Sequence, residues 1–124
     1  MFLTLTFNVR TVIKITIRRW SIYLARVPYT EDFTKKEIRP VIAIRKHGGD
    51  IIILPITSKI EKKYQFDLEI HLNQPSLIKV GNIQSIHQKD IIAPYQNLTT
   101  KALIYLDKDK KLEIITNLKQ LFTE

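Results

Sequence analysis

Residues 39–58 read RPVIAIRKHGGDIIILPITS, and this stretch decides the predicted fold. The runs 41–44 and 51–54 are apolar without alternation, which is typical of strands that are covered on both faces. Between them, His-Gly-Gly-Asp at 47–50 predicts a hairpin turn, because glycine reaches positive φ at little cost. The stretch therefore predicts two adjacent antiparallel strands buried within a sheet.

Residues branched at Cβ dominate the rest of the chain. Isoleucine accounts for 21 of the 124 residues, beside 11 threonines and five valines. Such side chains are stiff and pack well on a pleated surface, so the sequence indicates a mainly β protein. Short strands at close spacing with turn signals between them favour a small barrel or a curled sheet. The predicted strands cover residues 13–17, 20–27, 40–45, 51–55, 66–72, 77–80 and 83–86.

A helix is predicted at the C-terminal end of the sequence. After Asp109, apolar residues recur at helical spacing with polar residues between them, and either Asp107 or Asp109 is a suitable N-cap. The segment before it is ambiguous, since a shorter helix beginning at Thr99 and a strand over 102–106 fit equally well. The apolar positions of the predicted helix are Leu112, Ile115, Leu118, Leu121 and Phe122.

The first 17 residues, MFLTLTFNVRTVIKITI, are apolar enough to suggest a signal peptide. A signal peptide has an uninterrupted apolar core and small residues at its cleavage site. Here Arg10 and Lys14 interrupt the core, and no Ala-x-Ala follows. Apolar and polar residues alternate along the segment with the period of a half-buried strand. We interpret it as a strand or hairpin arm, with a processed segment as the alternative.

The composition is that of one globular domain spanning residues 1–124, with 44% apolar and 26% charged residues. A net charge of +8 favours a polyanionic partner such as nucleic acid, an anionic membrane surface or an acidic protein. The absence of cysteine excludes disulfides, thiolate zinc sites and cysteine nucleophiles, and suits a reducing cytoplasm. The three histidines are far apart, and no apolar run reaches the roughly 20 residues of a membrane span, so neither a metal site nor a span is predicted.

Two short motifs are candidates for chemistry. Arg39 precedes Pro40, which suits the first position of a strand because proline cannot donate to the ladder, so Arg39 is expected at a strand mouth. Thr57 and Ser58 follow the second buried strand, where two hydroxyls are able to bind phosphate oxygens and Lys59 adds a positive charge. The alternatives are a solvated surface arginine and two hydroxyls that cap a turn or a short helix.

Basic residues form three clusters, all at predicted strand ends or in loops. Cations that hold phosphates, interleaved with aromatic rings that stack bases, are typical of proteins that bind single-stranded nucleic acid. The alternative is a solvated charged face. The clusters are Lys35, Lys36 and Arg39; Arg45, Lys46 and His47; and Lys59, Lys62 and Lys63, with Tyr29, Phe33 and Tyr64 interleaved.

Taken in order, these features resemble the PemK/MazF family of toxin endoribonucleases. The resemblance covers residues 20–92, a little over half of the chain. Its specificity comes from several short pieces in the expected order and spacing rather than from any one of them. The matching pieces are IYLA at 22–25, RPVIAI at 39–44, IIILPITS at 51–58, KKY at 62–64, QPSLIKV at 74–80 and GNIQSI at 81–86.

The resemblance implies a small SH3-like β-barrel with a C-terminal helix, usually a homodimer, held inactive by an acidic antitoxin. Family members cleave single-stranded RNA without a metal or other cofactor and leave a 2′,3′-cyclic phosphate and a 5′-hydroxyl. In domain terms, it implies an extra N-terminal β segment over 1–19, a barrel over 20–95 and a helical C-terminus over 99–124. A cytoplasmic protein with no membrane partner is expected.

The resemblance also implies roles for individual residues. Arg39 corresponds to the family's arginine before proline and would stabilise the charged transition state, while Thr57 would donate to a phosphate oxygen with Ser58 supporting it. An arginine is a poor proton acceptor because its pKa exceeds about 12. These three residues are the catalytic candidates. The RNA-binding candidates are Lys35, Lys36, Lys59, Lys62, Lys63, Asn82 and Gln84.

Some positions depart from the family pattern. Trp20-Ser21 stands where the family has Gly-Asp before its first strand, and Gln84 replaces an arginine of its Q-I-R-T segment. Asn82 and Ser85 replace the glutamine and threonine of the same segment. Two alternative functions follow: a catalytically weak module of the same fold that binds RNA or a protein, and an SH3-like ligand module unrelated to RNA.

Overall fold

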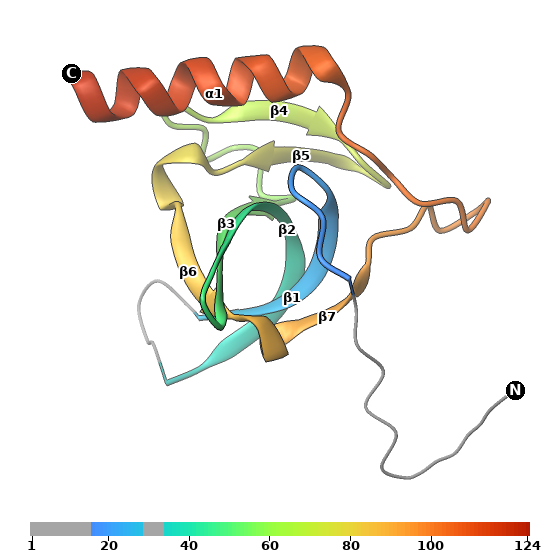
Figure 1. Cartoon of the computed structure of the whole chain (residues 1–124). Helices are drawn as coiled ribbons and strands as arrows, with labels where there is room; N and C mark the ends of the chain where they lie inside the picture. Colours follow the sequence, from blue (N-terminus) through green and yellow to red (C-terminus); the bar gives the residue numbers. More distant parts are fainter. Residues whose placement is uncertain (1–15, 29–33) are drawn as a thin grey trace, which may run out of the picture.

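The computed structural model describes residues 16–28 and 34–124. In the described residues, seven strands precede one long helix at the C-terminus (Figure 1). Two single-turn 3₁₀ helices, η1 (Val80–Asn82) and η2 (Gln88–Asp90), flank the sixth strand. The strands and the helix are β1 (Ile22–Pro28), β2 (Lys36–His47), β3 (Asp50–Thr57), β4 (Leu68–His71), β5 (Pro75–Ile78), β6 (Gln84–His87), β7 (Ile91–Pro94) and α1 (Lys108–Thr123).

The strands form one antiparallel sheet in the order β4-β5-β3-β2-β1-β7, with β6 also paired to β3. Figure 1 shows β1, β2, β3, β6 and β7 curling around a common interior, with β4, β5 and α1 stacked beyond it. The prediction of a mainly β fold with a C-terminal helix is confirmed, but the sheet is not a closed barrel. The path of the sheet ends at β4 and at β7, and one edge of β3 is shared, with Asp50–Ile53 paired to β6 and Ile56 and Thr57 paired to β5.

Both predicted buried strands are buried on both faces. In β3, Ile51 and Ile53 belong to a core cluster with Tyr23, whereas Leu54 belongs to a second cluster with Ile114 of α1. Successive side chains of a strand point to opposite faces, so a run without alternation supplies both clusters at once. The curled sheet therefore has one core inside the curl and another beneath the helix.

The hairpin and the helix cap agree with the sequence patterns. His47 and Asp50 are paired at the end of β2 and β3, and Gly48 between them has φ of +62°, the left-handed conformation that favours glycine. Asp107 is the N-cap of α1, where its carboxylate accepts a hydrogen bond of 2.7 Å from the Lys110 amide. Of the two capping residues that the sequence allowed, the structure selects Asp107.

Other expectations differ from the structure. Strand β7 was not predicted, because its four residues end in proline and carry no alternation. The segment before α1 forms neither a short helix nor a strand, and only isolated pairs join Gln96 to Leu103 and Ser21 to Tyr105. The predicted strand 13–17 lies outside the described residues except for residues 16 and 17, which belong to no strand. No helix within the described ranges has both the length and the apolar character to span a membrane.

Candidate active site

The candidate site lies where β2 and β3 separate. In the paired part of the two strands, Val41 lies opposite Pro55. If the pairing continued in the same register, Arg39 would lie opposite Thr57. The pairing of β2 with β3 ends at Val41 and Pro55, and Thr57 pairs on the other edge of β3 with Leu77 of β5. Arg39 lies beyond this pairing and is paired with Ala25 of β1. The end of the β2–β3 pairing therefore leaves Arg39 and Thr57 on the two sides of a gap.

A cavity of about 260 Å³ opens at this gap. Its lining includes Arg39, Thr57 and Ser58, the three residues that the sequence proposed as catalytic, together with Lys59. Pro40 also lines it and lies inside β2 rather than at its start, because β2 begins at Lys36. A proline is tolerated at this position because this part of β2 is paired only with β1. The edge of β2 that faces away from β1 therefore needs no backbone N–H donor.

Glu37 also lines the cavity, although the sequence analysis did not select it. Its carboxylate forms an ion pair with the Arg39 guanidinium, and both side chains are about 70% buried, with 30% and 29% exposed. Residues two apart on a strand share a face, so this pair follows directly from the strand beginning at Lys36. The sequence analysis began that strand at residue 40, which is why it missed Glu37. Gln74 and Tyr95 were missed for a different reason, since they reach the cavity from other parts of the chain.

Thr57 also serves the turn that follows β3. Its Oγ1 accepts a hydrogen bond of 3.2 Å from the Lys59 amide, as the capping alternative expected. A hydroxyl that accepts one hydrogen bond still has its own proton to donate, so this turn leaves Thr57 able to contact a phosphate oxygen. Ser58 is exposed beside it.

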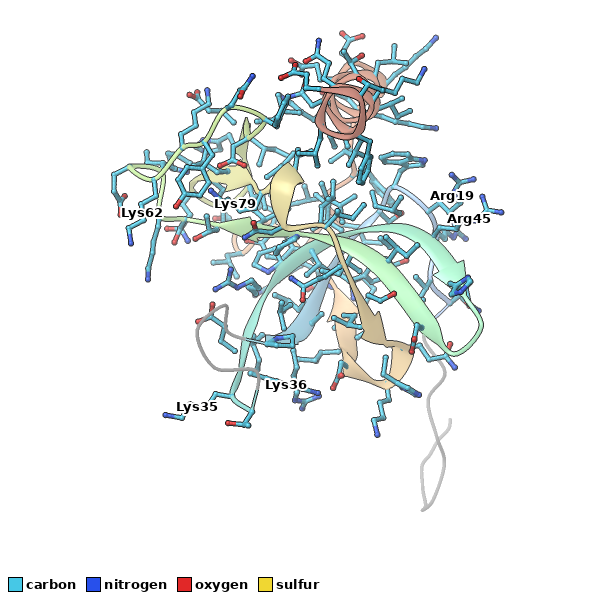
Figure 2. All side chains as sticks on the ribbon, turned by 90° about the vertical axis from the view of Figure 1, so that its left-hand side faces the viewer. Arg19, Lys35, Lys36, Arg45, Lys62 and Lys79 are labelled. Carbon is cyan, nitrogen blue, oxygen red and sulfur yellow. The ribbon has the colours of Figure 1, made fainter. Side chains whose placement is uncertain are left out.

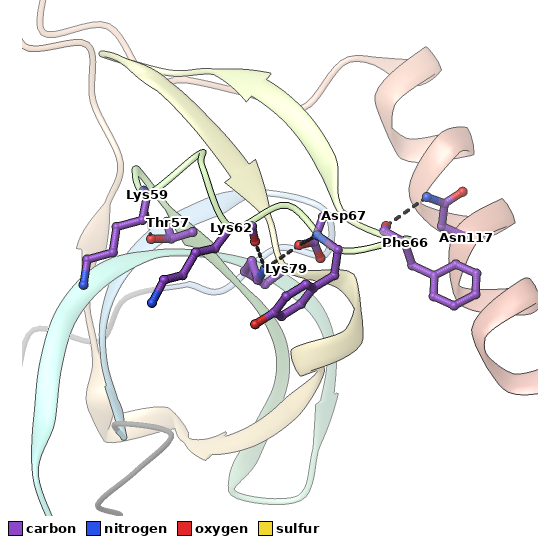
Figure 3. Close-up of polar contacts among 8 residues, drawn as sticks. Thr57, Lys59, Lys62, Phe66, Asp67, Lys79 and Asn117 are labelled. Carbon is purple, nitrogen blue, oxygen red and sulfur yellow. Dashed lines mark hydrogen bonds and ion pairs between the residues drawn. The ribbon is translucent and has the colours of Figure 1, made fainter.

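The segment between Thr57 and β4 is organised around one buried ammonium (Figure 3). Lys79 Nζ donates to the Lys62 carbonyl at 3.0 Å and forms a short ion pair with the Asp67 carboxylate. The same carboxylate accepts a hydrogen bond of 2.9 Å from the Tyr64 amide. Only 8% of the Lys79 side chain and 2% of the Asp67 side chain are exposed. The segment between Thr57 and β4 is thus held from beneath by a buried ion pair that no sequence pattern predicted.

The remaining predicted RNA-binding residues are not brought to the cavity. Lys36 forms an ion pair with Asp90 at 3.0 Å, and Lys63 forms one with Glu69 at 3.2 Å. Gln84 pairs with Ile53 in the middle of β3 rather than at its end. Lys35, Asn82 and the Lys62 side chain also lie outside the lining of the cavity.

The three basic clusters do not converge on one place. Figure 2 shows Arg45 beside Arg19, on the side of the molecule away from Lys62. Arg45, Lys46 and Arg19 line a separate cavity. Among residues 16–28 and 34–124, no group of three or more histidine, aspartate or glutamate side chains is placed to hold a metal ion.

Comparisons with known proteins agree with this fold. The family pattern described as "PemK-like, MazF-like toxin of type II toxin-antitoxin system" matches residues 18–122. Among solved structures, the Mycobacterium tuberculosis toxin MazF-mt6 superposes with a TM-score of 0.60 at 20% sequence identity, over 82% of this chain and 95% of that one. At that identity, the superposition shows a shared fold. No protein with a curated description matches the chain.

Proposed function

This chain belongs to the PemK-like, MazF-like toxins of type II toxin–antitoxin systems, and on that premise we propose that it is an endoribonuclease that cleaves single-stranded RNA. The observation that carries the proposal is the gap between β2 and β3, where Arg39, Thr57 and Ser58 line one cavity. A cation and two hydroxyls are the groups that a phosphate needs, and the basic segment 58–67 begins at the same cavity. The proposed partners are RNA and an acidic antitoxin, because the chain carries a net charge of +8.

The proposed reaction uses the RNA's own 2′-hydroxyl as nucleophile. Its oxygen attacks the adjacent phosphorus, the bond from phosphorus to O5′ breaks, and the products are a 2′,3′-cyclic phosphate and a 5′-hydroxyl. No water is consumed in this step, and one proton leaves O2′ while one reaches O5′. The protein therefore has to support negative charge on the phosphoryl oxygens and to accept the proton from O2′, while O5′ takes its proton from solvent water and the acceptor returns its own to solvent.

Arg39 and Thr57 are suited to the first task. A guanidinium presents several N–H donors in a plane and binds two oxygens of a phosphoryl group at once, which a lysine ammonium does less well. The Thr57 hydroxyl adds one more donor from the opposite side of the cavity. Removing a single donor of this kind from an active site costs about 100- to 1000-fold in rate.

Glu37 is suited to the second task. A carboxylate accepts a proton far more readily than an arginine, and Glu37 is the carboxylate in the lining of the cavity. Its ion pair with Arg39 holds the carboxylate at the cavity. We assign Glu37 as the acceptor of the 2′-hydroxyl proton, with Arg39 held for the phosphate.

The proposal is tested by incubating the protein with a long single-stranded RNA, with and without EDTA, and by mapping the ends of the fragments. We expect cleavage that EDTA does not alter, 2′,3′-cyclic phosphate on the upstream fragment and 5′-hydroxyl on the downstream one. Intact RNA or 5′-phosphate ends would contradict the proposal. RNA that is bound but not cleaved would support instead the catalytically weak binding module, for which Gln84 in place of the family arginine is the motivating observation.

The proposed assembly is tested separately. The family resemblance implies a homodimer, which sedimentation equilibrium of the full chain measures directly. Co-expression with an acidic protein encoded next to this one should abolish cleavage and yield a complex that survives size-exclusion chromatography. A monomer at all concentrations would refute the dimer without affecting the proposed reaction.

A further inference from the structure

Tyr64 is held in a fixed orientation on the surface. Its ring lies over the Lys79 ammonium, with 4.0 Å from Nζ to the ring centroid, and its amide donates to Asp67. Yet 65% of the residue is exposed to solvent. Backbone and side chain are thus both fixed by one buried ion pair, while most of the ring remains accessible.

A buried ion pair is a costly way to hold a loop. Removing an ammonium and a carboxylate from water is unfavourable, and the cost is offset only where hydrogen bonds complete the pair. Here the Lys79 ammonium donates a hydrogen bond to the Lys62 carbonyl and forms an ion pair with Asp67. It also makes a cation–π contact with the ring of Tyr64. A loop that only connected β3 to β4 would need none of this.

The Tyr64 ring is also connected to the candidate site. The Lys79 amide donates to the Pro55 carbonyl at 2.9 Å, two residues before Thr57, so the residue beneath the ring is anchored to the strand that carries the catalytic hydroxyl. Lys59 and Lys62 belong to the same segment, and Figure 3 shows their side chains extending to the same side of it. Neither side chain forms an ion pair within the described residues.

We propose that Tyr64 is a stacking platform for a base of the bound RNA, next to the phosphate at Thr57, and that Lys79 is the positioning residue that holds the ring. The inference rests on the proposed function and adds a base contact to a site otherwise made for phosphate. An aromatic ring between lysines is the combination that binds single strands, since lysines hold phosphates while the ring stacks a base. A ring that is ordered before binding loses little entropy when a base stacks on it.

The test compares two oligonucleotides that cannot be cleaved: a 2′-O-methyl RNA of ten nucleotides and an abasic oligomer with the same number of phosphates. Both oligonucleotides bind through their phosphates, but only the 2′-O-methyl RNA has bases that can stack on Tyr64. Tyr64→Ala should weaken binding of the 2′-O-methyl RNA by about 5- to 150-fold, the range for loss of one base–aromatic stack, and leave binding of the abasic oligomer unchanged. Tyr64→Phe, the matched control, keeps the ring and should bind both like the wild type.

Lys79 is tested through the ratio of the two affinities. The double variant Lys79→Met with Asp67→Asn removes both buried charges and retains an acceptor for the Tyr64 amide, so the chain is expected to stay folded, which thermal unfolding checks. Its preference for the oligonucleotide with bases should fall toward that of Tyr64→Ala. An unchanged preference would show that Lys79 serves stability alone.

Stacking is refuted if Tyr64→Ala binds both oligonucleotides like the wild type, or if it weakens both equally. Either result, obtained with a wild-type protein that cleaves RNA, overturns the platform and leaves the proposed function intact. A wild-type protein that neither binds nor cleaves RNA would overturn both together.

Discussion

Replacing Arg39 by alanine should lower the rate of RNA cleavage by about 100- to 1000-fold, the usual loss when one charged transition-state contact is removed. Arg39 lines the cavity together with Thr57, so the loss should appear in kcat at least as much as in KM. Arg39→Lys keeps the charge but loses the planar fork, and its rate should lie between those of the wild type and the alanine variant.

The structure also predicts the cost in stability. Arg39 and Glu37 have 29% and 30% of their side chains exposed, so their ion pair lies between a surface pair, worth about 0 to 1 kcal/mol, and a buried pair, whose breakage costs about 3 to 5 kcal/mol. Arg39→Ala leaves the Glu37 carboxylate without its guanidinium, and we expect a loss of about 1 to 2 kcal/mol. For a chain of this length, that lowers Tm by about 4 to 8 °C, which leaves the protein folded at assay temperature.

Cleavage of a fluorogenic RNA and thermal unfolding measure the two effects on the same preparations. Arg45→Ala is the matched control, because it removes the same charge from a residue that lines a different cavity. It should leave the cleavage rate within about a factor of two, allowing for weaker electrostatic attraction of RNA. The reasoning is refuted if Arg39→Ala cleaves at the rate of Arg45→Ala. If Arg39→Ala is unfolded at assay temperature, the residue is structural and its assignment to the site is wrong.

The remaining predictions concern the same site and its support. Thr57→Val preserves volume but removes the hydroxyl, so cleavage should fall by about 100-fold while Thr57→Ser retains most of the rate. Glu37→Gln should slow cleavage by about 100- to 10,000-fold, because an amide accepts no proton; cleavage at the wild-type rate would exclude Glu37 as the acceptor. RNA affinity should fall steeply as salt rises, and a salt-independent Kd would argue against phosphate binding. Lys79→Met alone leaves the buried Asp67 carboxylate without its ion-pair partner. It should lower the free energy of unfolding, measured with denaturant, by about 3 to 5 kcal/mol, which is more than in the double variant with Asp67→Asn.

Short patterns in the sequence were enough to predict the strands, the turn and the helix that have a characteristic run or spacing of residues. The apolar runs of β2 and β3 predicted strands buried on both faces, and the core contains them on both sides. Gly48 predicted the hairpin, and the spacing of apolar residues after Asp109 predicted α1, with Asp107 as one of two possible caps. In each case a few neighbouring residues are enough for the prediction. The periodicity of apolar residues, the φ preference of glycine and the capping of a helix are all properties of short segments.

Pairing between distant segments decided the rest. Strand β2 extends back to Lys36 through polar residues, since their backbone groups pair with β1, and this extension places Glu37 beside Arg39. The cavity lies where the pairing of β2 with β3 ends at Val41 and Pro55, while β2 continues beside β1 and β3 continues beside β5 on its other edge.

The burial of Lys79 also depends on a residue that is distant in the sequence. A lysine within a predicted strand is expected at the surface, yet this one is buried because Asp67, twelve positions earlier, compensates its charge. Sequence periodicity records which side chains avoid water. Which strand edge is paired and which buried charge is neutralised depend on residues that meet only after the chain has folded.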